Sequence, residues 1–198
     1  MNTKLEAKSF ELQKVKFNAK NGLVISWFDI NKPNDLYSVD SDSQPHEDYG
    51  TKLDALKEVF AYSLGLNNGW TFARENNRHN DESLKASIRF WKDEIERITI
   101  SGVSVVGVGS SKGIKISGSL KTDLGVVGLS SPIIRFESEF IDSIDETVMI
   151  GDLAETVFSA IEAEIYLFIY KGRRGGELFN SEAPVSGLNG AITLSKVG

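Results

Sequence analysis

Short apolar segments separated by turn residues dominate the middle of the chain. Ile114, Ile116 and Leu120 alternate with polar residues, which is the period of a strand with one solvent-exposed face. Glycine, serine and aspartate, which favour turns, lie between the segments at 109–113 and 122–125. The pattern predicts an antiparallel β-meander of three or four strands. The apolar segments lie at residues 98–100, 103–108, 114–116, 126–129 and 133–136, and we expect a bulge near Ser101-Gly102, between the first two.

The strongest helical pattern follows the meander, over about residues 146–171. Gly172 is suited to the C-terminal cap, and acidic residues at 145–146 suit the positive N-terminal end of the helix dipole. A sheet with one apolar face and a helix with one apolar stripe each need a partner, so we expect the helix to pack on the meander. The stripe consists of Ile150, Leu153, Val157, Ile161, Ile165 and Phe168.

The N-terminal part predicts a β-hairpin and then a helix. Residues 10–28 alternate between apolar and polar side chains around Asn21-Gly22, a dipeptide favoured in two-residue hairpin turns. Residues 47–64 have an apolar stripe at helical spacing. The segment between them, residues 31–48, is polar and acidic, and we expect a loop there.

A further helix is predicted over residues 82–94, although alternation within residues 87–94 leaves a strand open as the alternative. Residues 181–198 are mostly small and polar and predict a tail. The predicted fold class is therefore α+β, as a single domain over residues 1–180. In it, an antiparallel β-meander and an N-terminal hairpin pack against a long C-terminal helix and one or two further helices.

Composition limits the classes of protein to consider. Hydrophobic residues make up 40% of the 198 residues and charged residues 25%, which is typical of a globular domain. No cysteine is present, which excludes disulfides, thiolate nucleophiles and cysteine-ligated zinc. The start lacks an apolar signal segment, and the longest apolar run, residues 165–170, is too short to span a membrane. We expect a cytoplasmic protein without a membrane partner.

The sequence offers little support for catalysis, and we predict a non-enzymatic protein with no metal or cofactor. His46 and His79 lie in different polar segments, and neither has a second ligand at helical or strand spacing. The glycine-rich residues 107–113 suggest a phosphate-binding loop, but they lack the required order of glycine, lysine and serine or threonine. Since they also join two predicted strands, a hairpin turn is the favoured interpretation.

One polar segment combines aromatic with basic residues: Trp70, Phe72 and Arg74 stand among asparagines. Rings that stack on bases and guanidinium groups that contact phosphates are typical of proteins that bind single-stranded nucleic acid. The alternative, which the sequence favours, is a surface loop whose two aromatic side chains pack back onto the core.

Cations near the end of the C-terminal helix form the best candidate for a functional patch. Lys171, Arg173 and Arg174 would bind a phosphate backbone or an acidic protein surface. Lys112 and Lys115 in the meander would extend this patch only if the fold brings them alongside. The alternative is that the three C-terminal cations complement the helix dipole.

The predicted hairpin also has a basic outer face, formed by Lys14 and Lys16 with Lys20 near the turn. Lysines commonly keep the solvated face of a sheet soluble, so we favour a solvated face over a binding face.

Several short motifs occur in a fixed order along the chain. They are the pairs Pro45-His46 and Ser131-Pro132 and the segments 98–103, 113–118, 164–168 and 171–173. In this order they resemble a family of small, largely uncharacterised proteins encoded by phages and prophages of Bacteroidetes. The resemblance covers roughly residues 44–179, within which residues 70–87 look like an insertion. It implies a phage origin, and it supplies neither an activity nor catalytic residues.

Two hypotheses about function follow. The first is a non-enzymatic, phage-encoded protein of DNA metabolism that binds single-stranded DNA, with Lys171, Arg173 and Arg174 on phosphates and Trp70 and Phe72 stacked on bases. The second is a structural or interaction protein, in virion assembly or host-factor binding, that acts through protein contacts, including a homo-oligomer. Either would work in the cytoplasm of the infected host cell. The formal net charge of −6 argues against the first, because it requires a local basic patch on an acidic protein.

Overall fold

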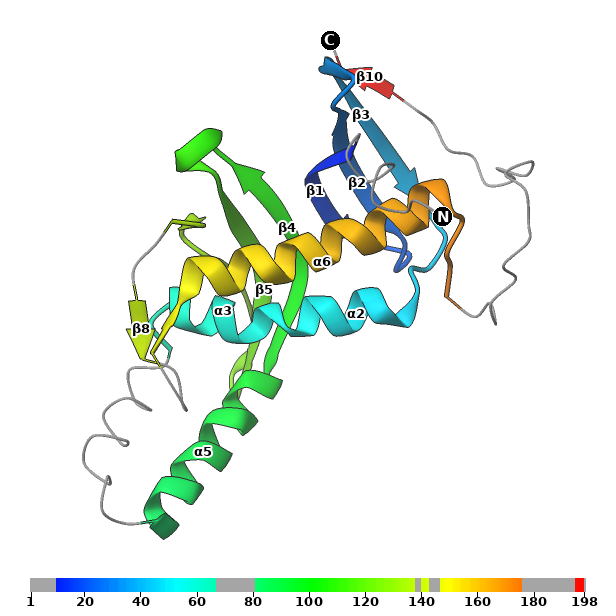
Figure 1. Ribbon diagram of the computed structural model, residues 1–198. Helices are drawn as coiled ribbons and strands as arrows, with labels where there is room; N and C mark the ends of the chain where they lie inside the picture. Colours follow the sequence, from blue (N-terminus) through cyan, green and yellow to red (C-terminus); the bar gives the residue numbers. More distant parts are fainter. Residues whose placement is uncertain (1–9, 67–80, 138–139, 143–146, 176–194, 198) are drawn as a thin grey trace. The chain divides into compact units, whose positions relative to one another are not determined.

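The computed structural model describes residues 10–66, 81–137, 140–142, 147–175 and 195–197 (Figure 1). The chain divides into two compact units, each assembled from separate stretches of sequence. Unit 1 comprises Met1–Leu53, Gly102–Val105 and Phe158–Gly198, and unit 2 comprises Asp54–Ser101 and Val106–Val157. Both units contain helices and antiparallel strands, so the predicted α+β class is confirmed.

Unit 1 is built on an antiparallel sheet in the order β10-β3-β2-β1. Residues Gly102–Val105, which belong to strand β4 (Ile98–Val106), pair with the far side of β1. The helices of this unit are α2 (Glu47–Asp54) and the C-terminal part of α6 (Ile150–Tyr170). The other strands are β1 (Phe10–Phe17), β2 (Leu23–Asp29), β3 (Lys32–Ser41) and β10 (Ser195–Val197).

The core of unit 1 lies between one face of this sheet and α6. The ring of Phe10 contacts the rings of Tyr166 and Tyr170, which project from the last turns of the helix. The backbone N–H of Leu12 donates a hydrogen bond of 2.7 Å to the carboxylate of Glu162, which fixes β1 against α6. The most deeply buried apolar side chains of this core are Leu12, Val15, Leu23, Ile25, Ile161 and Ile165.

The prediction of a loop over residues 31–48 is wrong, because β3 occupies Lys32–Ser41. Within it, Tyr37 stacks on Trp27 with ring centroids 5.7 Å apart, and Val39 is buried. Tyr37 and Val39 face the core, while Ser38 between them faces outward. Because most residues of this strand are polar, two inward apolar side chains were too few to show the alternation of apolar and polar positions that predicts a strand.

The prediction of a two-residue turn at Asn21-Gly22 is also wrong, although the hairpin itself is confirmed. The strands end at Phe17 and Leu23, so five residues form the connection. Asn18 closes it, because its Oδ1 accepts hydrogen bonds from the backbone N–H groups of Lys20 and Gly22. This is the local side-chain bonding for which asparagine is favoured in turns.

Unit 2 contains the rest of the meander. Strand β5 lies between β4 and β6, and β7 pairs with β5, while β8 and β9 form a separate two-stranded sheet. The helical elements are α3 (Leu56–Ser63), α5 (Asp81–Glu96), the start of α6 and a short 3-10 turn at Gly109–Ser111. The strands are β5 (Gly113–Thr122), β6 (Gly125–Ser130), β7 (Ile134–Arg135), β8 (Phe140–Asp142) and β9 (Thr147–Met149).

Alternate residues of β4 and β5 form the core of unit 2 with α3. Ile98, Ile100, Ile114 and Ile116 are all buried, in the alternation that the sequence predicts. The buried ring of Phe60 on α3 lies close to Gly118 of β5, where a Cβ would stand 3.4 Å from the ring. The tighter limit at this position is the backbone oxygen of Thr99 on β4, which would lie 2.6 Å from a Cβ, so the glycine lets β4 and β5 approach closely.

The predicted helices are largely confirmed. Residues 87–94 belong to α5 and not to a strand. The C-terminal helix begins at Ile150, because residues Thr147–Met149 form strand β9 and not its first turn. Gly172 has a φ of 69° at the end of α6, the left-handed conformation expected of a C-terminal cap. Residues 181–194 and 198 of the predicted tail lie outside the described residues, and residues Ser195–Val197 form strand β10, which pairs with β3.

Tyr49 of α2 gives a prediction about stability. Its hydroxyl is buried without a hydrogen-bond partner among the described residues, and its ring contacts that of Phe17. An unsatisfied buried hydroxyl is destabilising, so Tyr49→Phe should raise the free energy of unfolding by about 1 kcal/mol. Tyr62→Phe is the matched control, since the Tyr62 hydroxyl donates to Glu58 over 2.9 Å and its removal should lower stability. Urea denaturation of both variants measures these opposite changes in the free energy of unfolding.

The same residue gives stability a dependence on alkaline pH. Burial raises the pKa of Tyr49 above its ordinary value, so the folded state favours the neutral phenol. Its contribution is fully present below the unfolded-state pKa of about 10 and is lost as the pH rises above it, because the unfolded chain then releases the proton more readily. The advantage of Tyr49→Phe over the wild type should therefore widen above pH of about 10. A constant difference across that range would contradict this.

Candidate nucleic-acid interface

The outer face of the unit 1 sheet carries two exposed lysines. Lys14 and Lys16 lie two residues apart on β1 and so project from the same face. The next strands on either side present hydroxyl groups there, since Lys14 is directly opposite Ser104 on β4 and Ser26 on β2. Neither lysine has a hydrogen-bond or ion-pair partner within the part of the chain that the structure describes.

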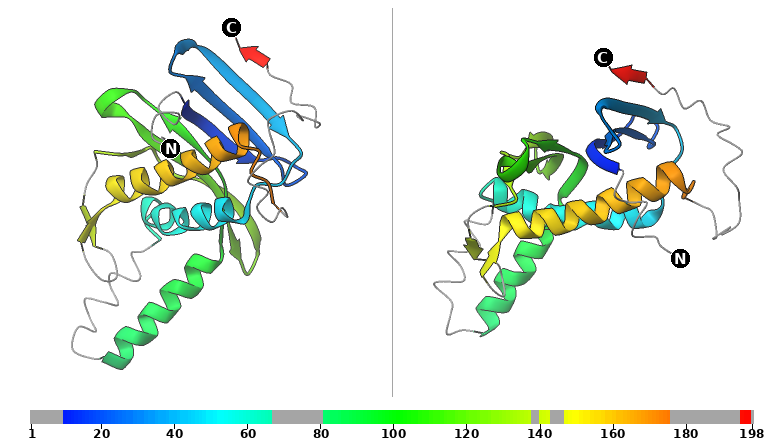
Figure 2. Two further views of the ribbon diagram at one scale, coloured as in Figure 1. Left: turned by 45° about the vertical axis from the view of Figure 1, so that its right-hand side comes forward. Right: turned by 45° about the horizontal axis from the view of Figure 1, so that its top comes forward.

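The same face continues across β2 and β3 (Figure 2). Ser26 is opposite Ser38, and the two hydroxyl oxygens are 3.4 Å apart. Phe28 lies two residues beyond Ser26 on β2 and is half-buried, so part of its ring is open to solvent. We name the set Lys14, Lys16, Ser26, Phe28 and Ser38 the β1–β3 outer face. It combines two cations, two hydroxyl groups and one aromatic ring on a sheet surface. Two carboxylates lie on the same face, those of Glu11, opposite Phe28, and Asp40, two residues beyond Ser38.

Arg173 is held by two carboxylates of unit 1. Its Nη1 donates a hydrogen bond of 2.7 Å to Glu164 of α6, and its Nη2 donates to Asp48 of α2. The Glu164 side chain is only 10% exposed and that of Arg173 22%, so the guanidinium lies largely out of solvent. A phosphate would have to displace one of the carboxylates to reach it.

Arg174 is likewise engaged within unit 1. Its guanidinium lies over the Phe168 ring, 3.6 Å from the centroid, and donates to the backbone carbonyl of the same residue. Lys171 is exposed, at the C-terminal end of α6. Arg173 and Arg174 are therefore engaged by protein groups, which resembles the predicted alternative of helix-end complementation more than an open patch.

The other predicted binding residues divide between two places. Trp70, Phe72 and Arg74 lie outside the described residues, so their predicted stacking and phosphate contacts stay predictions. Lys112 and Lys115 belong to unit 2, whereas the C-terminal cations belong to unit 1. Lys115 is exposed on β5 and Lys112 follows the 3-10 turn.

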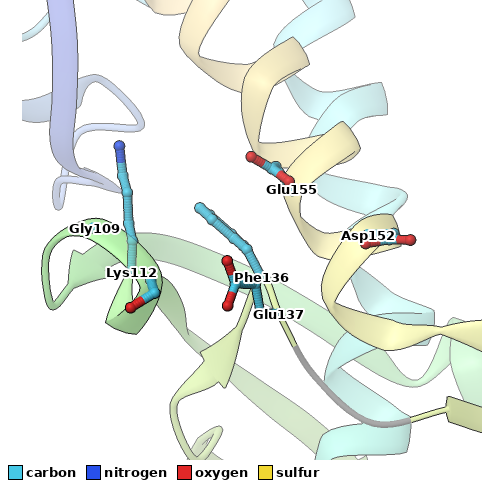
Figure 3. Close-up of a pocket in the computed structure, with 7 residues that line it drawn as sticks. Gly109, Lys112, Phe136, Glu137, Asp152 and Glu155 are labelled. Carbon is cyan, nitrogen blue, oxygen red and sulfur yellow. The ribbon is translucent and has the colours of Figure 1, made fainter.

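Unit 2 contains a hollow of about 500 Å³. Lys112 and Phe136 lie on one side, and Asp152 and Glu155 of α6 on the other (Figure 3). With Glu137, three carboxylates and one lysine line this space, so the balance of charge disfavours an anionic ligand. The glycine-rich residues 107–113 border it as a turn between β4 and β5, as the hairpin interpretation expects.

Metal-binding clusters and membrane-spanning helices are both absent from the described residues. No cluster of three or more histidine, aspartate and glutamate side chains able to hold a metal ion occurs among them. His46 is half-buried, and its Nδ1 accepts a hydrogen bond from the backbone N–H of Asp48. No helix within the described part is long and apolar enough to cross a bilayer.

Comparison of the chain with protein-family models, with curated proteins and with solved structures gives no match. The resemblance to phage proteins therefore stays a prediction from the sequence motifs.

Of the β1–β3 outer face, only Lys14 and Lys16 were predicted from the sequence; Ser26, Ser38 and Phe28 were not, and the clearest missed signal is that of Phe28. Its neighbours Leu23, Ile25 and Trp27 face the core, and the phase of this alternation would place Phe28 outside. The sequence signal was therefore an apolar residue at a strand position that faces solvent and is usually polar.

Proposed function

We propose that the protein is a non-enzymatic binder of single-stranded DNA and that the β1–β3 outer face is its principal contact surface. The observation that carries the proposal is the pair Lys14 and Lys16, both exposed and both without a partner in the described residues. Two ammonium groups on adjacent outward positions of one strand suit the backbone of a nucleic acid, which supplies negative charge at every nucleotide.

The neighbouring groups support this surface chemically. Serine hydroxyls donate hydrogen bonds to phosphate oxygens, and Ser26 and Ser38 lie beside the lysines on the next two strands. Phe28 offers a partly exposed ring on which a base can stack. Stacking tolerates every base, so such a surface binds without strong sequence preference.

The predicted roles of the other residues are part of the same proposal. Trp70 and Phe72 would add stacking, and Lys171 would add a phosphate contact. Arg173 would contribute little, because its charge is already balanced by Asp48 and Glu164. A place in phage DNA metabolism follows from the sequence resemblance and belongs to the proposal as well.

The test is fluorescence anisotropy of a labelled single strand of about 30 nucleotides, a length that exceeds typical binding sites. Lys14/Lys16→Glu should abolish binding at moderate salt. Loss of two phosphate contacts should also make the slope of log affinity against log salt shallower by about 1.4, since each contact contributes about 0.7 on single strands. Phe28→Leu should weaken binding about tenfold and leave that slope unchanged.

Lys85/Lys92→Glu is the matched control, because both lysines are exposed on α5 and the formal net charge falls from −6 to −10 in either double variant. An equal loss of binding in the two double variants would mean that overall charge governs the attraction and would count against this surface. The proposal fails outright if the wild type does not bind at low salt, where nonspecific attraction is strongest.

A further inference from the structure

Strand β6 forms an open edge in the described part of unit 2. It pairs with β5 on one side, and no described strand pairs with its other side. Natural edge strands are usually protected from other chains by charged residues, proline or a bulge. β6 contains none of the first two, and its pairing with β5 runs without a register shift from Gly125 to Ser130.

The hydrogen-bonding pattern shows which backbone groups of β6 point outward. The N–H of Ser131 donates to the carbonyl of Ile116 over 2.9 Å, so position 131 is bonded to β5. Antiparallel partners alternate between bonded and non-bonded pairs, which directs the N–H and C=O groups of Val126, Gly128 and Ser130 away from β5. Three residues at alternate positions therefore offer both a donor and an acceptor at the open edge.

Apolar side chains accompany this edge. Val126 is 70% exposed and Val127 48%, and Leu124 at the preceding turn is fully exposed. Exposed valines on an unpaired edge strand are the kind of surface that a second strand covers.

The sequence of β6 is self-complementary about Gly128. An antiparallel pair of β6 strands related by a two-fold axis at Gly128 places Val126 opposite Ser130 of the second copy, and Val127 opposite Leu129. The outward backbone groups then meet in three bonded pairs, which form six hydrogen bonds. On one face, Val127 and Leu129 of the two copies become cross-strand neighbours, and such apolar pairs stabilise a sheet.

Gly128 is suited to the axis of this pairing. A Cβ built on it has no atom within 4 Å, so no part of the described chain uses the space beside it. On the axis, the Cα atoms of the two copies would lie about 5.5 Å apart, the spacing of a hydrogen-bonded antiparallel pair.

The distribution of charge indicates which chain pairs with the open edge of β6. No charged residue occurs from Leu124 to Ile134, so the edge has no group with which to recognise a charged foreign strand. The rest of the chain is acidic, with a formal net charge of −6, and the neutral edge is where two copies approach without local repulsion. We infer that a second copy of this chain is the partner of β6 and that the protein forms a two-fold dimer through a continuous β6–β6 ladder.

This inference goes beyond DNA binding and is independent of it, and the test contains no DNA. Sedimentation equilibrium over a dilution series should give a mass of twice the 21.8 kDa chain for the wild type. Gly128→Lys and Gly128→Glu should each give the monomer mass, because each places two like charges face to face at the axis. An equimolar mixture of the two variants should restore the dimer, since unlike charges then meet there.

Leu124→Lys is the control, because it adds the same charge at the exposed turn outside the paired residues 126–130 and should leave the dimer intact. Circular dichroism and thermal unfolding of the two position-128 variants confirm that the monomers are folded, as the open space at Gly128 leads us to expect. A monomeric wild type at every concentration overturns the inference, and so does a Gly128→Lys variant that stays dimeric. A mixture that fails to reassociate also overturns it.

Discussion

Arg173→Ala should lower the free energy of unfolding by about 3 kcal/mol, because removing one partner of a largely buried ion pair leaves the other charge uncompensated. The charge left behind is Glu164, whose side chain is 10% exposed and bonds Arg173 over 2.7 Å. Asp48 loses the same partner, but it is 43% exposed and water will solvate it. Urea denaturation followed by circular dichroism measures the loss.

Two further variants identify the cause. Adding Glu164→Gln to Arg173→Ala should recover part of the lost stability, because the uncompensated charge is then removed. Lys20→Ala breaks the exposed pair with Asp42, in which both side chains are more than 60% exposed, and should have little effect. If Arg173→Ala is no more destabilising than Lys20→Ala, the ion pairs of Arg173 do not stabilise unit 1.

This expected loss also affects how DNA binding is assigned. A triple Lys171/Arg173/Arg174→Ala variant would remove the ion pairs of Arg173 and the contact of Arg174 with Phe168. Reduced binding in that variant would report partial unfolding of unit 1 as readily as a lost phosphate contact. Lys171→Ala alone is the cleaner substitution, since it leaves the ion pairs of Arg173 and the ring contact of Arg174 in place.

Gly22→Ala should be destabilising by about 3 kcal/mol, the upper part of the range for steric overpacking. A Cβ at this position would lie 1.9 Å from the backbone oxygen of Ser41, which is far inside van der Waals contact. Relief requires movement of β3, and the Ser41 oxygen also accepts a hydrogen bond from the Asn18 side chain. The clash is with backbone and cannot be relieved by a rotamer change.

Gly50→Ala is the matched control, because a Cβ there has open space within helix α2. Alanine is the better helix former, so this variant should gain about 0.5–1 kcal/mol. The same substitution should therefore lower stability at position 22 and raise it at position 50, and thermal unfolding of both variants measures the two changes. A Gly22→Ala protein as stable as the wild type would mean that β2 and β3 are not paired as closely as the structure has them.

The parts of the fold that were predicted are those with a strong local period. The buried alternation of β5 and the apolar period of α6 each repeat over several residues, so the sequence indicates both elements directly. The predicted stripe of α6 is right at Ile150, Ile161, Ile165 and Phe168, but Ala154 and Phe158 are buried in place of Leu153 and Val157. On β3, Tyr37, Val39 and the buried Ser41 point inward, but only two of the three are apolar, and the polar composition of the strand concealed it. The five-residue turn is closed by the Asn18 side chain. The prediction was wrong because Asn21-Gly22, at the end of this turn, is a dipeptide favoured in two-residue turns.

The candidate site was less predictable for a different reason. Arg173 and Asp48 are 125 residues apart in sequence, and no local pattern indicates that they meet. From the sequence, phosphate binding by Arg173 was weighed against complementation of the helix dipole, and neither interpretation includes its two carboxylate partners. The lysines of β1 were correctly predicted on the outer face. Phe28 can be assigned to the same face only from the buried residues of β2, which show which positions of that strand point outward.

The hydrogen bond between Leu12 and Glu162 joins residues that are 150 positions apart. On the ribosome, at roughly 10 residues per second, about 15 s would separate the synthesis of β1 from that of the helix that covers it. Throughout that interval the inward face of β2, with Leu23 and Ile25, has no α6 against which to pack. The nascent chain is therefore expected to be a substrate for holding chaperones until α6 has emerged, and its yield in cells should depend on their supply more than its final stability suggests.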